Sequence, residues 1–526
     1  MFSQVPVADI PRSRFNRSHG HKTTFDVANL IPIYVDEALP GDTFQVKCTA
    51  FARLATPIFP IMDNIYLDFF FFAVPNRLLW DKWERFMGEQ PNPGDSIDFL
   101  VPQATSPTGV GWQVNTLGDY FGLPTTFTNL VANALPFRAY NLIWNEWFRD
   151  QNLQARAPEY IGDGPDPAAT AAADYAIRKR GKRHDYFTSC LPWPQKGTAA
   201  SIFPGTGSTA PVIAGPTNTP LFSSADGFTI NQQLSRAAGI PGPTTVGATT
   251  SGVSLLRWGA QTGLVADLSQ SVATTINQLR QAFAVQRLLE RDARGGTRYV
   301  ELLKSHFGVV SPDFRLQRPE FLGGGTIPVN INPVSQTSAT ALTGSTTPLG
   351  NLAAYGLAAG SSPGFTKSFT EHCTLIGLVA ARADMNYYQG MARAWSRRSR
   401  YDYYWPAFSH IGEQDVKNKE IYYQGNANDD LPFGYQERWA EYRYFPNRVT
   451  GRFRPGASGG DYKEWHLAET FGSLPTLNGT FIQENPPMSR IKAVAGANDF
   501  LFDSHFDIAC TRPLPAYSVP GMLDHF

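Results

Sequence analysis

The sequence predicts a mainly β fold of antiparallel strands with long, partly helical connections, and three stretches indicate it. Residues 43–54 alternate polar and apolar side chains, which is the period of a strand with one buried face. Residues 65–74 read IYLDFFFFAV and end at Pro75, so this apolar run suits a strand buried on both faces. Residues 373–383 repeat a strand pattern late in the chain. A strand covered on both faces implies a thick β core, or a sheet with further structure laid over each side.

The composition agrees with a large core and favours assembly. The chain has 526 residues, of which 42% are hydrophobic and 13% aromatic, and its formal net charge is zero with only 17% charged residues. Length alone allows about two to four domains, although a large all-β unit can exceed that prior. Aromatic residues are favoured in strands and at protein interfaces. A neutral, weakly charged surface does little to keep molecules apart, so the composition favours a protein that associates.

Residues 1–25 form a basic arm that we expect to be extended, with a plain solvated terminus as the alternative. Its cations are Arg12, Arg14, Arg17 and Lys22. The arm has no secretory hydrophobic region, and no stretch of the chain is long enough to cross a bilayer. We therefore expect cytosolic synthesis and no membrane span. The four cysteines lie far apart, which predicts reduced, buried thiols.

Helical spacing is found in three later stretches. After Pro75 the apolar side chains of residues 78–87 return at intervals of three or four, which predicts a helix. Residues 135–152 carry a stronger amphipathic pattern, and residues 276–294 form a third one that ends at two glycines. Between the last two, the basic run of residues 178–184 (RKRGKRH) contains five Lys or Arg and no acid.

Residues 198–270 differ from the rest of the chain and are interpreted as an insertion. They contain four charged residues beside ten Gly and six Pro, and a loop of this length is unusual inside a compact fold. Enough apolar side chains remain for the segment to pack, so we expect turns with short strands or helices of its own. Three aromatic residues are candidates for an exposed contact there: Phe222, Phe228 and Trp258. Residues 326–366 contain no charge, which is expected where backbone packs on a neighbouring chain; a flexible linker is the alternative.

Motifs for catalysis are weak. Residues 360–364 (GSSPG) match the G-x-S-x-G pattern of hydrolases, but Pro363 follows the serine and has no N–H to donate to an oxyanion. Residues 323–325 are three glycines without the Lys-Ser/Thr of a phosphate-binding loop, so we expect a turn. The histidines and cysteines lack metal-ligand spacing, and the acid pair Asp429 and Asp430 lies in turn-like sequence that indicates solvation. We therefore expect neither an enzyme nor a metal or other cofactor.

A basic stretch rich in aromatic residues begins near residue 382. Its arginines face few acids, and cations beside aromatic rings are typical of proteins that bind single-stranded nucleic acid with little sequence preference. The alternative is that the rings belong to the core or to an interface while the arginines pair with carboxylates. The candidate DNA contacts here are Arg393, Arg397, Arg398, Arg400, Tyr401 and Tyr403, in addition to the four cations of the basic arm.

Several long blocks of the sequence resemble one known family. They include RSRFNRSHGHKTTFD at residues 12–26, DFFFFAVPNRLLWDKWERFMGE at residues 68–89, RHDYFTSCLPWPQKG at residues 183–197 and FGYQERWAEYRY at residues 433–444. On these blocks the chain resembles the major capsid proteins of the gokushovirus-like Microviridae, which are small tailless icosahedral phages with single-stranded DNA. The resemblance covers nearly the whole chain outside residues 198–270.

The resemblance implies one jelly-roll domain over residues 1–526, an eight-stranded antiparallel β-barrel with long loop insertions that contain short helices. It implies a T=1 icosahedral shell in which copies of the chain meet at two-, three- and five-fold contacts around a circular single-stranded DNA genome. The basic arm and the arginine-rich stretch are then candidates for the inner wall, where a packaged genome needs counter-charge.

Further partners follow from the same resemblance. Residues 198–270 occupy the place of a variable insertion that forms a surface protrusion at the three-fold axis and contacts the host cell. The other implied partners are minor virion proteins and an unknown host receptor. The implied location is the virion, with synthesis and assembly in the host bacterial cytoplasm.

The alternative function is a carbohydrate-binding or carbohydrate-active protein of the secreted type, also built on an aromatic-rich β scaffold. Such a protein needs a secretion signal, and a glycosidase needs a pair of carboxylates in a cleft. The sequence displays neither a secretion signal nor a recognisable pair of this kind, and it therefore favours the capsid interpretation.

Overall fold

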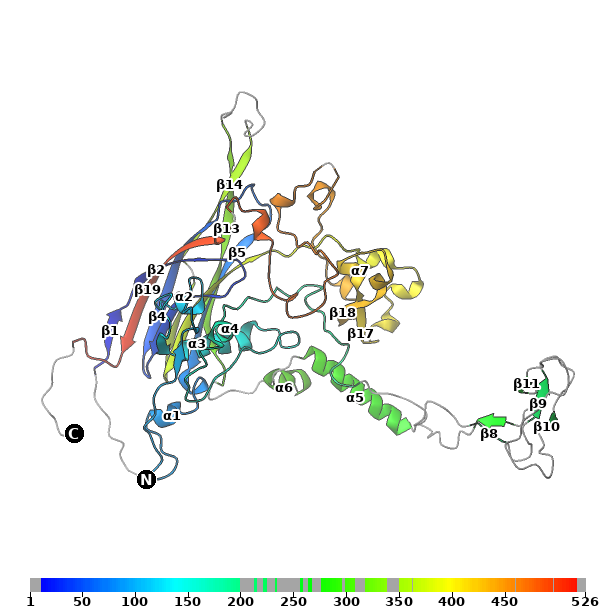
Figure 1. Cartoon of the computed structure of the whole chain (residues 1–526), viewed down its shortest axis with the longest axis horizontal. Coiled ribbons are helices and arrows are strands. Elements are labelled where there is room, and N and C mark those ends of the chain that lie inside the picture. The colour runs from blue at the N-terminus through cyan, green and yellow to red at the C-terminus, as the bar shows by residue number, and fades with distance from the viewer. Residues whose placement is uncertain are drawn as a thin grey trace. The chain divides into compact units, whose positions relative to one another are not determined.

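The computed structural model describes residues 11–198, 276–295, 299–307, 317–337, 350–361 and 363–517, except residues 459 and 495, together with five short strands between residues 212 and 266. The chain divides into two compact units, of which the first comprises Met1–Pro194 with Thr297–Phe526 and the second Gln195–Gly296. The first unit contains the main sheet (Figure 1).

Ten strands form this sheet, and every hydrogen-bonded pair in it is antiparallel. The path runs β1–β19–β4–β14–β13–β5–β16–β3, while β2 also pairs with β19 and β15 with β4. The mainly β fold predicted from the sequence is confirmed. The strands are β1 (Ser13–Asn16), β2 (His19–Phe25), β3 (Ile31–Ala38), β4 (Thr43–Leu54), β5 (Ile65–Pro75), β13 (Glu320–Ser335), β14 (Leu352–Gly360), β15 (Gly364–Ser368), β16 (Cys373–Ala383) and β19 (Phe500–Arg512).

The sheet curls until the strands at its two ends come into contact. The ring of Tyr34 in β3 stacks on that of Phe506 in β19, with 5.5 Å between the ring centroids. Arg17, which follows β1, donates to the carboxylate of Asp36 in β3 at 2.5 Å. Side chains therefore join the two ends of a curled antiparallel half-barrel, which agrees with the expected jelly-roll architecture.

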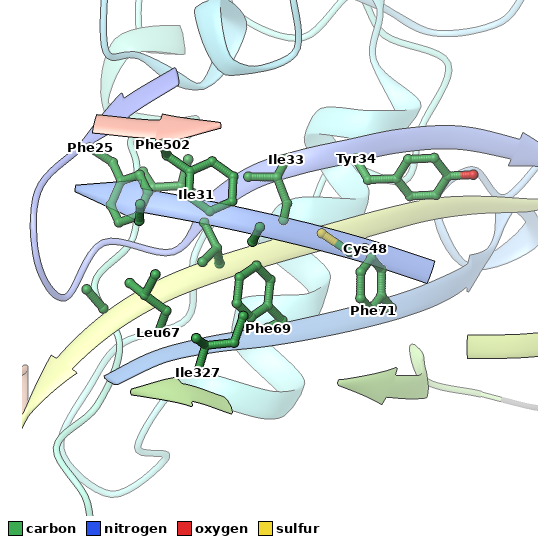
Figure 2. Close-up of a cluster of buried hydrophobic side chains, with 14 of the residues drawn as sticks. Phe25, Ile31, Ile33, Tyr34, Cys48, Leu67, Phe69, Phe71, Ile327 and Phe502 are labelled. Atoms are coloured by element: carbon green, nitrogen blue, oxygen red, sulfur yellow. The ribbon is translucent and has the colours of Figure 1, made fainter. Parts of the chain in front are cut away.

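The barrel core lies on the inner face of this sheet. In β4 the even-numbered residues from 44 to 54 are all buried, as the alternation of the sequence predicts. Figure 2 shows Phe69 and Phe71 of β5 in the same apolar cluster as Cys48 of β4 and Phe502 of β19. The four cysteines are free and buried, as predicted.

Strand β5 is buried on both faces, which confirms the prediction from its Phe-rich run. Phe69 and Phe71 belong to the barrel core, whereas Phe72 and Val74 belong to a second apolar cluster on the opposite face. Helix α3 (Leu135–Ile143) covers that face and contacts both β5 and β16. One strand thus joins two cores, because its neighbouring side chains alternate between them.

The two helices predicted near this face differ in outcome. The helix expected over residues 135–152 consists of α3 followed by the π-helical turn η2 (Trp144–Phe148). The helix expected over residues 78–87 is confirmed only in part, since α1 (Trp83–Phe86) forms within it and the 3-10 helix η1 (Asn76–Leu78) precedes it. Between them the fully buried Trp80 donates its indole N–H to Asp163 at 2.8 Å.

The turn predicted at the three glycines of residues 323–325 is also wrong, because they lie inside β13 and pair with β5. The register shifts between Phe321 and Gly323, as at a β-bulge. A Cβ atom on Gly324 would lie 2.1 Å from the carbonyl oxygen of Phe69. Glycine is required here because the two backbones approach more closely than any side chain allows.

The remaining elements of the first unit are short. They are β6 (Gln103–Thr105) paired with β7 (Val131–Asn133), β17 (Glu413–Lys417) paired with β18 (Pro432–Glu437), α2 (Leu117–Tyr120), α4 (Ala171–Asp174), α6 (Tyr299–Phe307), α7 (Asn418–Ile421), and the 3-10 helices η3 (Arg393–Ser396), η4 (Arg400–Asp402), η5 (Pro406–Phe408), η6 (Ala427–Asp430), η7 (Ala440–Tyr442), η8 (Gly451–Phe453), η9 (Lys463–Trp465) and η10 (Met488–Arg490).

The second unit contains one long helix and five short strands. Helix α5 has the bounds Ile276–Arg294 that the apolar spacing predicts. Strand β8 (Val212–Ala214) pairs with β12 (Leu264–Ala266). Strand β9 (Leu221–Ser224) pairs with both β10 (Gln232–Gln233) and β11 (Leu256–Trp258). The insertion therefore has short strands of its own.

Candidate nucleic-acid and assembly surfaces

Residues 391–412, which we name the arginine–tyrosine segment, follow β16 and contain the 3-10 helices η3, η4 and η5. A hydrogen bond from Arg393 to the carbonyl oxygen of Asp415 at 2.6 Å joins the segment to the small sheet of β17 and β18. The segment places four of the predicted arginines in two different environments.

Arg393 lies inside an ion-pair network. Its guanidinium donates to the buried carboxylate of Glu420 at 3.0 Å, and the second oxygen of that carboxylate accepts from Tyr186 at 2.8 Å. Burial raises the pKa of Glu420, although Arg393 opposes the shift. Burial also disfavours the charged form of Arg393, but the surrounding carboxylates, Glu420 first, raise its pKa overall. Arg393 therefore stabilises a buried acid.

Arg397 is held in a similar way. It donates to Glu441 at 3.3 Å, its guanidinium carbon lies 4.3 Å from the centre of the Tyr442 ring, and its side chain is only 12% exposed. For Arg393 and Arg397 the geometry favours the alternative stated from the sequence, in which the arginines pair with carboxylates. DNA contact by these two residues stays a prediction.

The other predicted residues of the segment are exposed. Asp402 accepts the backbone N–H groups of Ser399 at 2.7 Å and Arg398 at 2.9 Å, and these bonds lower the pKa of Asp402. Arg400 lies over the ring of Tyr401 at 5.0 Å. The turn thus fixes the backbone while the side chains point outward; those exposed are Arg398, Arg400, Tyr401 and Tyr403.

These side chains belong to a wider surface, which we name the exposed aromatic face. Trp395 is 76% exposed, and Phe445 in a neighbouring loop is 77% exposed. The two loops touch, because the rings of Tyr404 and Tyr442 lie 6.4 Å apart. We define the face as the exposed aromatic residues of these two loops, which are Trp395, Tyr401, Tyr403, Tyr404, Trp405, Tyr442, Tyr444 and Phe445. Exposed apolar patches of this kind mark interaction sites.

Tyr442, Tyr444 and Phe445 of this face were not predicted as part of a site. The sequence displays the aromatic residues of 433–444 plainly, but their spacing gives no sign that they turn outward beside the arginine–tyrosine segment. Only the fold brings residues 395–405 and 442–445 together, through the pairing of β17 with β18 and the packing of Trp439, whose indole N–H donates to Phe408 at 3.1 Å.

The basic arm is part of the main sheet from Ser13 onward, as β1 and β2. Arg17 pairs with Asp36, and Lys22 pairs with Asp503 on β19. Arg12 donates to the carbonyl oxygen of Gly41, while Arg14 is exposed. The candidate cations of the arm therefore lie on one edge of the sheet, and the first ten residues lie outside the described part of the chain.

The three aromatic candidates of the insertion fall in the second unit. Phe222 in β9 and Trp258 in β11 are register partners, so their backbones lie side by side. Phe228 lies outside the described residues. Contact of this unit with a receptor stays a prediction.

Two motifs of the sequence are also placed. Gly360 ends β14 and Gly364 begins β15, so the G-x-S-x-G match joins two strands and lacks the helix that follows a hydrolase nucleophile. The prediction that Asp429 is solvated is wrong, because its buried carboxylate accepts the backbone N–H groups of Gln424 at 2.9 Å and Gly425 at 2.7 Å. Asp430 is exposed, as predicted, and its salt bridges to Lys419 and Lys417 lower its pKa to about 2.

Over the described ranges, no group of three or more His, Cys, Asp or Glu side chains could hold a metal ion. None of the helices in the described part of the chain has the length and apolar character to cross a membrane.

Comparison with known proteins decides the family. A family model described as "Capsid protein (F protein)" matches residues 3–522. The chain belongs to this capsid protein family. Capsid protein VP1 of Bdellovibrio phage phiMH2K is 48% identical over 100% of this chain and 98% of that protein. The VP1 proteins of Chlamydia phage 1 and Spiroplasma virus 4 are 45% and 36% identical, each over 99% of this chain and 97% of the relative.

The family resemblance stated from the sequence is thereby confirmed, and with it the role of a structural capsid protein. A capsid protein functions in the virion by association with copies of itself.

Proposed function

We propose that this capsid protein closes with copies of itself into an icosahedral shell of T=1 arrangement that encloses a circular single-stranded DNA genome. Minor virion proteins and assembly in the host bacterial cytoplasm belong to the same proposal. The exposed aromatic face carries it, because a subunit that functioned alone would have to keep these rings in water.

The composition of this face suits contact between subunits. Its rings are accompanied by arginines and by no lysine across residues 391–412 and 438–448. Interface cores are enriched in aromatic residues and Arg and depleted in Lys. Aromatic side chains also dominate the binding free energy of such contacts. We therefore assign the rings of the exposed aromatic face to a contact between two copies of the chain, and the exposed arginines Arg398 and Arg400 to contact with DNA.

Electron microscopy of the purified protein tests the shell. Small uniform closed particles are expected, and a protein that stays monomeric under all assembly conditions would refute the proposal. The double variant Trp395→Ser with Phe445→Ser should retain the circular dichroism spectrum of the native subunit but form few closed particles. Phe127→Ser, in an exposed loop elsewhere, is the matched control and should assemble normally.

The DNA contacts are tested by charge removal. Arg398→Gln with Arg400→Gln should lower the DNA content of purified particles, measured by the ratio of absorbance at the nucleic-acid and protein maxima, while assembly persists. Arg53→Gln, exposed on β4, is the matched control for loss of a surface arginine. Unchanged DNA content would place Arg398 and Arg400 at subunit contacts instead.

The second unit is proposed to meet the host cell. Its strands and helix form a compact unit of their own, which supports an insertion that can vary without disturbing the main sheet. Deletion of residues 198–270 should leave closed particles but change their attachment to host cells. Loss of assembly would instead make the insertion a clamp between subunits.

A further inference from the structure

A second site with aromatic and basic residues lies on the face of β5 that points away from the barrel core. A cavity of about 350 Å³ opens there, near the lower end of the range of roughly 300–1,000 Å³ that is usual for ligand pockets. Its rings are Phe70, Phe72, Trp147, Phe148 and Phe321. The other lining residues come from the basic run of residues 178–184, and no carboxylate is among the lining residues.

The rings form a packed platform with an open side. The ring of Trp147 lies 5.5 Å from that of Phe72 and 5.9 Å from that of Phe321, while Phe70 packs edge-on against Phe148 at 5.1 Å. Trp147 and Phe321 are 42% and 43% exposed, whereas Phe72 is buried. The outer two rings are therefore accessible to a flat ligand, and the inner rings hold them in place.

The platform is held rigidly by the backbone. Trp147 donates its indole N–H to the carbonyl oxygen of Pro319 at 2.9 Å, which ties η2 to the start of β13. Phe321 lies beside the register shift of β13, where the strand bends. A preformed platform loses little conformational entropy when a ligand stacks on it.

The basic side chains around the cavity fall into two groups. Arg180 is bound to Asp68, and Lys182 donates to Glu469 at 2.7 Å, so a carboxylate of the protein neutralises each of these two charges. Arg318 is exposed and lies over the ring of Trp147 at 5.6 Å, and His184 is exposed at the rim. Arg318 and His184 are thus free to face an anionic group beside the rings.

We propose that this cavity, which we name the β5 pocket, binds a nucleotide of single-stranded DNA. The base stacks on Trp147 and Phe321, and a backbone phosphate faces Arg318 and His184. Rings that stack bases beside cations that follow the phosphates are the physical basis of single-strand binding with little sequence preference. This inference rests on the proposed function, in which the shell encloses single-stranded DNA.

The β5 pocket suits DNA better than the exposed aromatic face does. The arginine–tyrosine segment directs Arg393 and Arg397 into carboxylates and presents Asp402 among its exposed residues. A carboxylate at the surface repels phosphate, and the β5 pocket has none in its lining. The sequence already displays the basic run of residues 178–184, but only the fold places it beside the outward-facing rings of β5.

The test measures binding of a fluorescein-labelled oligodeoxythymidylate of about ten nucleotides to the dissociated full-length subunit at low salt. Trp147→Leu and Phe321→Leu should each weaken binding at least about five-fold. Trp147→Phe, which keeps a ring, should bind nearly as tightly as the native protein. Arg318→Gln should reduce the dependence of binding on salt. The matched control is Phe127→Leu, which removes an exposed ring far from any of these cations in sequence.

Native binding by both leucine variants would overturn the inference. A second measurement does not depend on how the variants fold: ultraviolet cross-linking of the native protein to the same oligonucleotide should label the peptides of Trp147 or Phe321. Cross-links confined to other peptides would overturn it, as would dTMP alone binding as tightly as the oligonucleotide, since the ligand would then be a free nucleotide.

The inference and the proposed function can fail separately. Suppose that Trp147→Leu subunits bind the oligonucleotide with native affinity and form closed particles that contain DNA. This result would refute DNA binding at the β5 pocket, while the proposed shell would stand. Native particles without DNA would refute the proposed enclosure of a genome. A Trp147→Leu variant that binds the oligonucleotide normally but fails to assemble would assign the β5 pocket to a neighbouring subunit and overturn the inference.

Discussion

Glu484 gives this capsid protein a buried group that titrates near neutral pH. One of its oxygens accepts the backbone N–H of Ala383, the last residue of β16, at 2.8 Å. Burial raises the pKa of Glu484 to about 7, although the bond from Ala383 and the charge of Arg180 oppose the shift. We predict that Glu484→Gln gains stability relative to the native protein as the pH rises from about 4.5 to 8.

The sign follows from proton binding. In the unfolded chain Glu484 ionises near its ordinary pKa of 4.5, whereas in the folded chain it keeps its proton until the pH approaches 7. Between these values the folded state binds more protons, so the free energy of unfolding falls as the pH rises and this loss is complete above about 7. A change from 4.5 to about 7 corresponds to about 3 kcal/mol.

Glutamine is neutral throughout and keeps an oxygen for the N–H of Ala383, so the variant should escape this loss. Urea unfolding of dissociated subunits, followed by tryptophan fluorescence at several pH values, measures it. The difference in free energy of unfolding between Glu484→Gln and the native protein should rise by up to about 3 kcal/mol between pH 4.5 and 8. Other titrating groups cancel in this difference.

Glu89→Gln, at an exposed position, is the matched control for the loss of one carboxylate. Its difference from the native protein should stay nearly constant over the same range. A constant difference for Glu484→Gln as well would refute the reasoning, because it would mean that the fold imposes no cost on the ionised carboxylate.

Two further predictions concern the sites described above. Arg393→Gln should lower the free energy of unfolding by about 3 kcal/mol because it removes the partner of a buried carboxylate, whereas Arg398→Gln should change it by less than about 0.5 kcal/mol. Urea unfolding measures both variants, and equally small effects would contradict the ion-pair network. Gly324→Ala should yield insoluble protein because its Cβ would collide with the carbonyl oxygen of Phe69, while Gly20→Ala in β2 should stay soluble; soluble, folded Gly324→Ala by circular dichroism would contradict the close strand approach.

The strands could be predicted from the sequence because their signals are local. Alternation in residues 43–54, the apolar run of residues 65–74 and the pattern of residues 373–383 each reflect burial of every second side chain or of every side chain. The helix of residues 276–294 was predictable for the same reason, since its spacing is carried by the segment itself.

The predictions that failed concern residues whose structure depends on contacts between distant segments. The glycines at residues 323–325 have the local signature of a turn, but the backbone of Phe69, distant in sequence, decides that they form a strand. The acid Asp429 has the signature of a solvated turn, but the loop before it closes over its carboxylate. A tertiary contact overrides local propensity wherever it stabilises the fold by more free energy than the locally preferred turn would.

The site residues also divide into what local sequence predicts and what only contacts between distant segments decide. Composition located a basic, aromatic stretch, and the fold then divided its arginines into those that neutralise buried acids, such as Arg393, and those that are exposed, such as Arg398. No spacing rule distinguishes the two, because the acids come from three separate elements, β17, α7 and η7. Pairing across the chain therefore decides which cations remain for a ligand.

Strand β5 links the architecture of the shell subunit with its proposed ligand. Its alternation places Phe69 and Phe71 in the barrel core and turns Phe70 and Phe72 to the other face. Asp68 in the same strand binds Arg180 and Arg382, so the buried carboxylate fixes part of the basic run against that outer face. The net pKa of Asp68 is lowered because hydrogen bonds from Arg180 and Thr326 outweigh its burial, which keeps it charged and Arg180 in place. The residues that build the core thus also position the rings and the basic run of the β5 pocket, so a mutation that loosens β5 should weaken DNA binding and stability together.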